Sequence, residues 1–154
     1  MLSPSENSAT RLVRLSRAAR TSVYVATAAV TVSGLLWLYA RFGPSADPTG
    51  PSPWAATTLA IHGACAIAAT VVFGALLANH VAYRWRRPGN RALGYLQLGL
   101  WITLLITGFA LYYLANETTR PVWSATHWIV GLLLPIALAV HVLIGQRTAR
   151  PVSQ

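Results

Sequence analysis

The chain has 154 residues, of which 55% are hydrophobic and only 10% are charged, and its mean hydropathy is +0.49. Soluble domains carry about 25% charged residues, so this composition excludes an ordinary soluble protein and indicates an integral membrane protein. A single cysteine, Cys65, excludes a disulfide framework and a thiolate cluster.

Four segments are long enough to cross a bilayer, since a transmembrane helix needs about 20 mainly apolar residues. In chain order they are 22–40, 54–82, 92–115 and 122–145. The first is longer than the ~7–15-residue apolar core of a signal peptide and lacks a cleavage site, so we interpret it as a retained helix. We expect an all-α, four-helix transmembrane bundle over 22–145, with a basic N-terminal arm (1–21) and a short tail (146–154).

The net charge of +9 comes from twelve arginines, and their placement follows membrane topology. Four lie in the arm, four in the loop after the second span and two in the tail, against Arg41 and Arg120 on the other side. Because cytoplasmic loops hold the excess of basic residues, we expect both termini in the cytoplasm of a bacterium and the helices in its inner membrane. Anionic lipid, and no nucleic acid, is the expected partner of these arginines.

All four histidines lie in predicted spans: His62 and His80 in the second, His127 and His141 in the fourth. Ionisable residues inside a bilayer are rare and costly, so each histidine is a candidate functional residue. Separations of 18 and 14 residues put each pair on one helix face, about 27 Å and 21 Å apart along the axis. Spans two and four run in the same direction, so His62 and His127 share the outer level, and His80 and His141 the inner level.

Two imidazoles at each level match the two axial positions of a haem iron. We therefore expect His62 with His127, and His80 with His141, to ligate two b-type haems; no Cys-x-x-Cys-His motif is present for covalent attachment. Bis-imidazole ligation leaves no open position on iron, which favours electron transfer. Zinc or copper would need further ligands, and a proton relay would need carboxylates in the spans. His80, next to the head-group level, fits least well.

The stretches HGACAIAATVVFGALLANH and HWIVGLLLPIALAVH resemble the paired-histidine helices of the di-haem cytochrome b superfamily. That superfamily includes the b subunits of cytochrome bc complexes, formate dehydrogenases and nickel–iron hydrogenases, and small four-helix b-type cytochromes. Ligands on the second and fourth helices, and the 14-residue separation, are similar to the bc arrangement. The 18-residue separation is longer, and the first span lacks the ligand that several small bacterial members have there. The resemblance covers about residues 22–145.

The resemblance implies electron transfer across the membrane between a separate redox protein on the outer side and the quinone pool. Tyr95, Gln97 and Trp101 are candidates for a quinone site, or belong to an interfacial aromatic belt. The loops are too short for a catalytic domain, which favours an electron-transfer subunit over a complete enzyme. Two alternatives stay open: a stand-alone haem oxidoreductase acting on a small redox species at the outer face, and a non-haem accessory subunit whose histidines only hydrogen-bond between helices.

Small residues lie one turn from the outer histidines. Ala66 follows His62 by four positions, and Gly131 follows His127 by four. A small residue beside a ligand leaves room for a flat ring, but it equally allows two helices to approach closely. The spacing by itself does not decide between these two roles.

Overall fold

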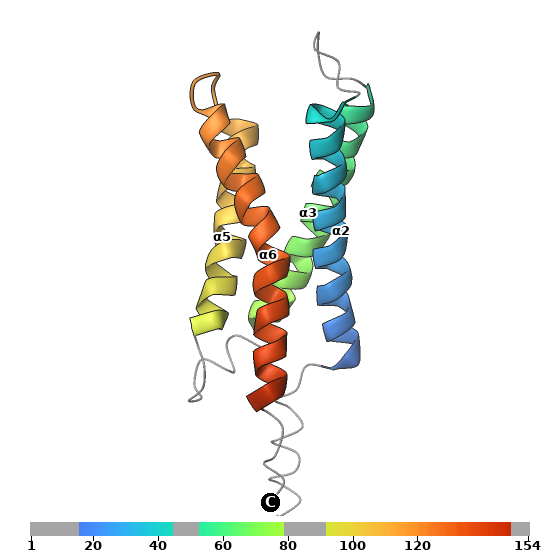
Figure 1. The fold of residues 1–154 in the computed structure, drawn as a ribbon, viewed down its shortest axis with the longest axis vertical. Helices are drawn as coiled ribbons and strands as arrows, with labels where there is room; N and C mark the ends of the chain where they lie inside the picture. The colour runs from blue at the N-terminus through green and yellow to red at the C-terminus, as the bar shows by residue number, and fades with distance from the viewer. Residues whose placement is uncertain (1–15, 45–52, 79–91, 149–154) are drawn as a thin grey trace, which may run out of the picture. The chain divides into compact units, whose positions relative to one another are not determined.

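The computed structural model describes residues 16–44, 53–78 and 92–148, and its regular elements there are four long helices (Figure 1). They are α2 (Arg17–Phe42), α3 (Pro53–Leu76), α5 (Ala92–Tyr113) and α6 (Arg120–Thr148). No strand occurs among these described residues, so the prediction of an all-α fold is confirmed.

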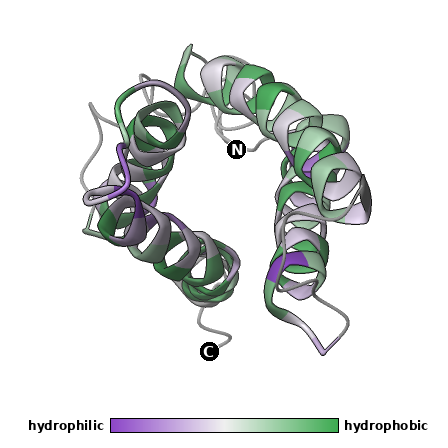
Figure 2. Ribbon diagram, turned by 90° about the horizontal axis from the view of Figure 1, so that it is seen from above, coloured by the Kyte–Doolittle hydropathy of each residue, from purple (hydrophilic) through white to green (hydrophobic). Residues whose placement is uncertain are grey.

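Each of the four helices is long and apolar enough to cross a membrane. Hydrophobic residues cover most of their length (Figure 2). Large apolar side chains point outward, as Ile67 and Val71 on α3 do with 71% and 69% of their surfaces exposed. A water-facing helix would present polar groups there. The chain is therefore a multi-pass membrane protein whose helices contact lipid.

Two helices extend beyond their predicted spans. α2 begins at Arg17, inside the predicted N-terminal arm, and Ser16 caps it by accepting a hydrogen bond from the Ala19 N–H at 3.1 Å. α6 takes in Arg120 at its start and continues to Thr148. Arginine has good helix propensity and its long side chain reaches away from the apolar stretch, so helical backbone continues past the apolar run. The end of the predicted second span, 79–82, lies outside the described residues.

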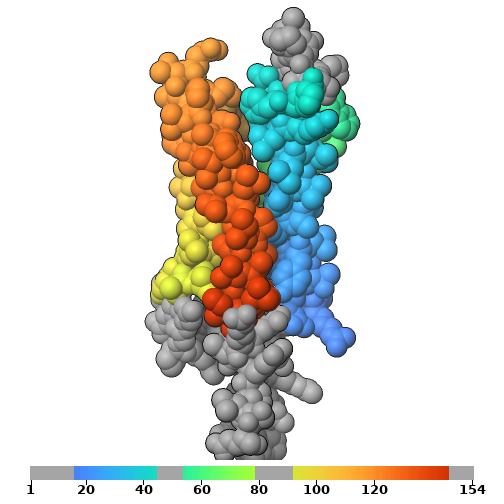
Figure 3. Space-filling view, in the orientation of Figure 1, coloured from blue at the N-terminus to red at the C-terminus, as the bar shows by residue number. Residues whose placement is uncertain are grey.

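The helices form two compact units, and each unit contains one helical hairpin. In the first, α2 packs against α3, and in the second α5 packs against α6. The space-filling view shows the surface of α6 running alongside that of α5 (Figure 3). The predicted assembly of the hairpins into one bundle stays a prediction.

Small and hydroxyl side chains make up most of the buried positions. The first unit buries Thr27, Ser33 and Ala40 on α2, and Ala55, Thr58, Ala69 and Phe73 on α3; the second buries Thr107, Ala110 and Leu134. Small residues let two membrane helices approach closely. A buried hydroxyl is tolerated because it can donate to a carbonyl of its own helix, as Thr58 does to Ala55 at 3.0 Å.

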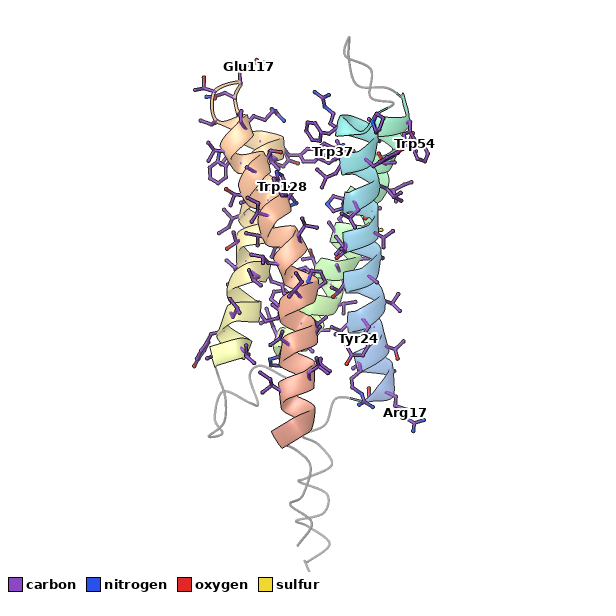
Figure 4. All side chains as sticks on the ribbon, in the orientation of Figure 1. Arg17, Tyr24, Trp37, Trp54, Glu117 and Trp128 are labelled. Atoms are coloured by element: carbon purple, nitrogen blue, oxygen red, sulfur yellow. The ribbon has the colours of Figure 1, made fainter. Side chains whose placement is uncertain are left out.

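A tight turn joins α5 to α6. The Thr119 N–H donates to Asn116 Oδ1 at 2.9 Å, and the Asn116 N–H donates to Thr119 Oγ1 at 3.2 Å. This reciprocal pair satisfies N–H groups that α6 would otherwise leave exposed at its start. In Figure 4, Glu117 marks the tip of this turn.

Tryptophans gather near one end of the first hairpin. Trp37 and Trp54 lie towards the end where α2 stops and α3 begins, whereas Arg17 lies at the opposite end (Figure 4). Arg41 lies in the last turn of α2, so both ends of this helix carry arginine. Tryptophans near an interface and arginines at the helix ends are typical of a helix that spans a bilayer.

Candidate functional site

His62 lies on α3 and is held from α2 by Ser33. The Ser33 Oγ and the His62 Nδ1 are 3.1 Å apart. The same hydroxyl lies 3.1 Å from the Val30 carbonyl of its own helix, to which it donates. Ser33 is buried, with 4% of its surface exposed. The imidazole of His62 is thus fixed through one of its two nitrogens by the neighbouring helix of its own hairpin.

Gly34, the residue after Ser33, brings the α2 backbone up to the same ring. A Cβ at this position would lie 3.1 Å from His62 Cε1 and 3.3 Å from Nδ1. Both distances are shorter than ordinary van der Waals contact, so an alanine would require the ring to shift by a few tenths of an ångström. Glycine at position 34 allows this close approach, and its backbone has no positive φ.

His127 has an equivalent environment in the second hairpin. Thr107 on α5 places its Oγ1 2.8 Å from the His127 Nδ1. The same hydroxyl lies 2.7 Å from the Thr103 carbonyl, to which it donates. Thr107 is buried, with 2% of its surface exposed. The next residue, Gly108, also faces the ring: a Cβ there would lie 3.4 Å from His127 Cε1.

Both hairpins therefore contain the same local arrangement, in which a hydroxyl residue followed by glycine on the first helix contacts the imidazole of the second helix. We call this pair of residues the hydroxyl–glycine unit. The segments that carry it are Val32-Ser33-Gly34 and Ile106-Thr107-Gly108. The sequence did not single out Ser33 and Thr107, because neither lies on a helix that holds a histidine. The signal was present: aligning the first and third spans brings β-branched, hydroxyl and glycine residues into register.

The four predicted ligands differ in what the structure says of them. His127 and His141 lie on the continuous helix α6, which also contains Pro135. His62 belongs to the first unit and His127 to the second, so their pairing stays a prediction. His80 lies outside the described residues, and the inner pair with His141 also stays a prediction.

Gly131 faces α5 in the structure. A Cβ at this position would lie 3.8 Å from Leu104 Cδ2 on α5, an ordinary contact, so an alanine would fit there. The two roles that the sequence left open for this glycine both stay open. The glycines that approach the histidine rings, Gly34 and Gly108, come from the partner helices.

Among the candidates for a quinone site, Gln97 has a side chain whose amide oxygen could accept a hydrogen bond from a ligand. Its Oε1 is buried and has no hydrogen-bond partner within the described part of the chain. Tyr95, two residues earlier on α5, has 45% of its surface exposed. A buried amide oxygen without a partner carries a free-energy cost that a donor from a ligand would relieve.

A comparison of the chain with protein-family models, with curated proteins and with solved structures finds no match to any of them.

Proposed function

We propose that the chain is a membrane b-type cytochrome that binds two haems through four histidines and carries electrons across the bilayer. One observation supports this above all. His62 and His127, expected at one membrane level, have the same hydroxyl–glycine unit at the ring. The hydroxyl and the histidine are 29 residues apart in one hairpin and 20 apart in the other. The loops between the helices therefore differ in length, and they do not explain why the geometry at the ring is the same.

This environment suits a ligand better than a histidine that only packs between helices. A packing histidine needs a hydrogen-bond partner, which Ser33 and Thr107 supply. A glycine against the ring, at 3.1 Å for a Cβ on Gly34 and 3.4 Å for one on Gly108, is a further constraint that a packing histidine does not need, since nothing then has to hold the imidazole at one position. A metal ligand does, because a small displacement of its nitrogen weakens the coordinate bond and misdirects it. The donor set, neutral imidazoles held through Nδ1, therefore fits a haem.

When bound, haem supplies the one-electron redox chemistry of its iron. The chain contributes the rest: His62 and His127 hold the outer group, His80 and His141 hold the inner group, and the apolar helices keep water away. The proposed partners are a separate redox protein on the outer side and quinone in the membrane. The buried Oε1 of Gln97 supports a quinol hydroxyl as its hydrogen-bond donor.

A reduced-minus-oxidised absorption spectrum of the purified protein tests the proposal. We expect the α band of a b-type haem and two haems per chain by extraction assay. A variant in which all four histidines are alanine should be inserted in the membrane but colourless. A parent protein that inserts and folds yet shows no haem spectrum would instead indicate an accessory subunit whose histidines only hydrogen-bond.

The proposed location is the inner membrane of a bacterium, with both termini in the cytoplasm. In a Cys65→Ser background, Glu117→Cys should react with a membrane-impermeant maleimide added to intact spheroplasts. Gln154→Cys should react only after the membrane is permeabilised. The reverse pattern of labelling would invert the topology, and equal labelling at both positions would contradict a crossing of the membrane by α6.

A further inference from the structure

We propose that Ser33 and Thr107 are positioning residues that fix the proton of His62 and His127 on Nδ1. The lone pair of each ring is then on Nε2, and each imidazole becomes a more basic ligand. The assignment of the proton stands on the hydrogen bonds alone, whereas its effect on iron rests on the proposed function.

The proton count at Thr107 is decisive. Its hydroxyl has a single hydrogen, and the Thr103 carbonyl, 2.7 Å away, accepts and cannot donate. The hydrogen is therefore directed to that carbonyl. The oxygen meets the His127 Nδ1 at 2.8 Å with a lone pair. Two lone pairs at this distance would repel each other, so Nδ1 must carry a hydrogen and donate it. The two hydrogen bonds form a chain, which we call the relay: the His127 Nδ1–H donates to the Thr107 hydroxyl, which donates to the Thr103 carbonyl.

At Ser33 the Val30 carbonyl is shared. The Ser33 hydroxyl lies 3.1 Å from this carbonyl, and His62 is hydrogen-bonded to it as well. A carbonyl only accepts, so the hydrogen on this side of the ring comes from His62, whose Nδ1 lies 3.1 Å from the Ser33 Oγ. Both relays end on a carbonyl of the helix that supplies the hydroxyl. Both distances are longer than those of Thr107, so the Ser33 relay is the weaker of the two.

The relay matters for ligation because a neutral imidazole carries only one ring proton. With that proton on Nδ1, the metal-binding lone pair is on Nε2. A ligating histidine that donates its other N–H to an acceptor is a more basic ligand, and the acceptor fixes its tautomer and orientation. A more basic ligand stabilises ferric over ferrous iron, so each hydroxyl should lower the reduction potential of the haem that it serves.

Nitrogen-15 NMR of the haem-free protein in detergent micelles, at alkaline pH, tests the relay without any cofactor. We expect the Nδ1–H tautomer at His62 and His127, whereas a free histidine side chain favours Nε2–H. Thr107→Val should shift His127 towards Nε2–H, and Thr107→Ser should restore Nδ1–H. Thr103→Val is the matched control, since it keeps the Thr103 backbone carbonyl and removes only a hydroxyl that donates to the Gly99 carbonyl of its own helix. An Nε2–H tautomer at His127 in the parent, or an unchanged tautomer in Thr107→Val, would overturn the proposal.

A redox titration of the haem-loaded protein tests the consequence. Thr107→Val should shift the one-electron equilibrium of one haem towards reduction by up to about tenfold, which is about 59 mV. Ser33→Ala should shift it in the same direction by less. Thr103→Val and Thr70→Val should leave it unchanged, since the hydroxyl of Thr70 on α3, like that of Thr103, donates to a carbonyl of its own helix. An equal shift in the control variants would overturn the effect on iron. A folded chain without haem would refute the proposed function, while the NMR result would still decide the relay.

Discussion

Under the proposed function, a His127→Ala protein is expected to bind one haem instead of two, and His62→Ala is expected to lose the same haem. The two imidazoles would hold the same iron, so removal of either would leave it with a single protein ligand in an apolar site that supplies no replacement. The haem that remains should keep its own absorption band and potential. Haem per chain by extraction assay, together with a redox titration, measures both effects.

The double variant His62→Ala/His127→Ala sharpens this prediction. If the two residues hold one group, the double variant should bind as much haem as either single variant, a strongly non-additive result. Thr126→Val is the neighbouring control, because it removes a hydroxyl that donates to the Val122 carbonyl of its own helix. Imidazole added to His127→Gly should restore part of the lost band. Loss of the same haem by His62→Ala and His141→Ala, but not by His127→Ala, would refute the pairing by level.

The helices were predictable because an uncharged apolar run of this length has only one stable form in a bilayer. Every backbone N–H and C=O must be satisfied inside the segment, which a helix does. The helix ends were less predictable. α2 and α6 extend past the apolar run to Arg17 and Arg120. Hydropathy does not predict these ends, because they depend on capping by Ser16 and Asn116 and therefore on local backbone geometry.

The histidines of the candidate site were predictable because an imidazole in a lipid-spanning segment is costly and therefore stands out. Ser33 and Thr107 do not stand out, since hydroxyl residues are common in membrane helices and usually bond to their own backbone. Their role depends on which face of α2 and α5 meets the next helix, and this is a property of packing. A search for the same short pattern in alternate spans would have found Ser33-Gly34 and Thr107-Gly108.

The second large effect is expected at the glycines that approach the histidine rings. Gly34→Ala places a Cβ 3.1 Å from His62 Cε1, so the ring must move and its hydrogen bond to Ser33 must lengthen. Overpacking of this kind costs about 1–3 kcal/mol, which corresponds to a loss of about 5- to 150-fold in affinity for the outer haem. Haem titration of the apoprotein measures the loss.

A graded series separates this cause from a general effect on folding. A Cβ at Gly108 would lie 3.4 Å from His127 Cε1, and one at Gly99 would have no atom within 4 Å. We therefore expect Gly108→Ala to weaken the outer haem less than Gly34→Ala, and Gly108→Val to weaken it more than Gly108→Ala. Gly99→Ala should leave haem binding unchanged, and its thermal stability should rise slightly because alanine has less backbone freedom to lose on folding. The prediction fails if Gly99→Ala and Gly34→Ala lower haem affinity equally, since contact between the new Cβ and the His62 ring would then not be the cause of the loss.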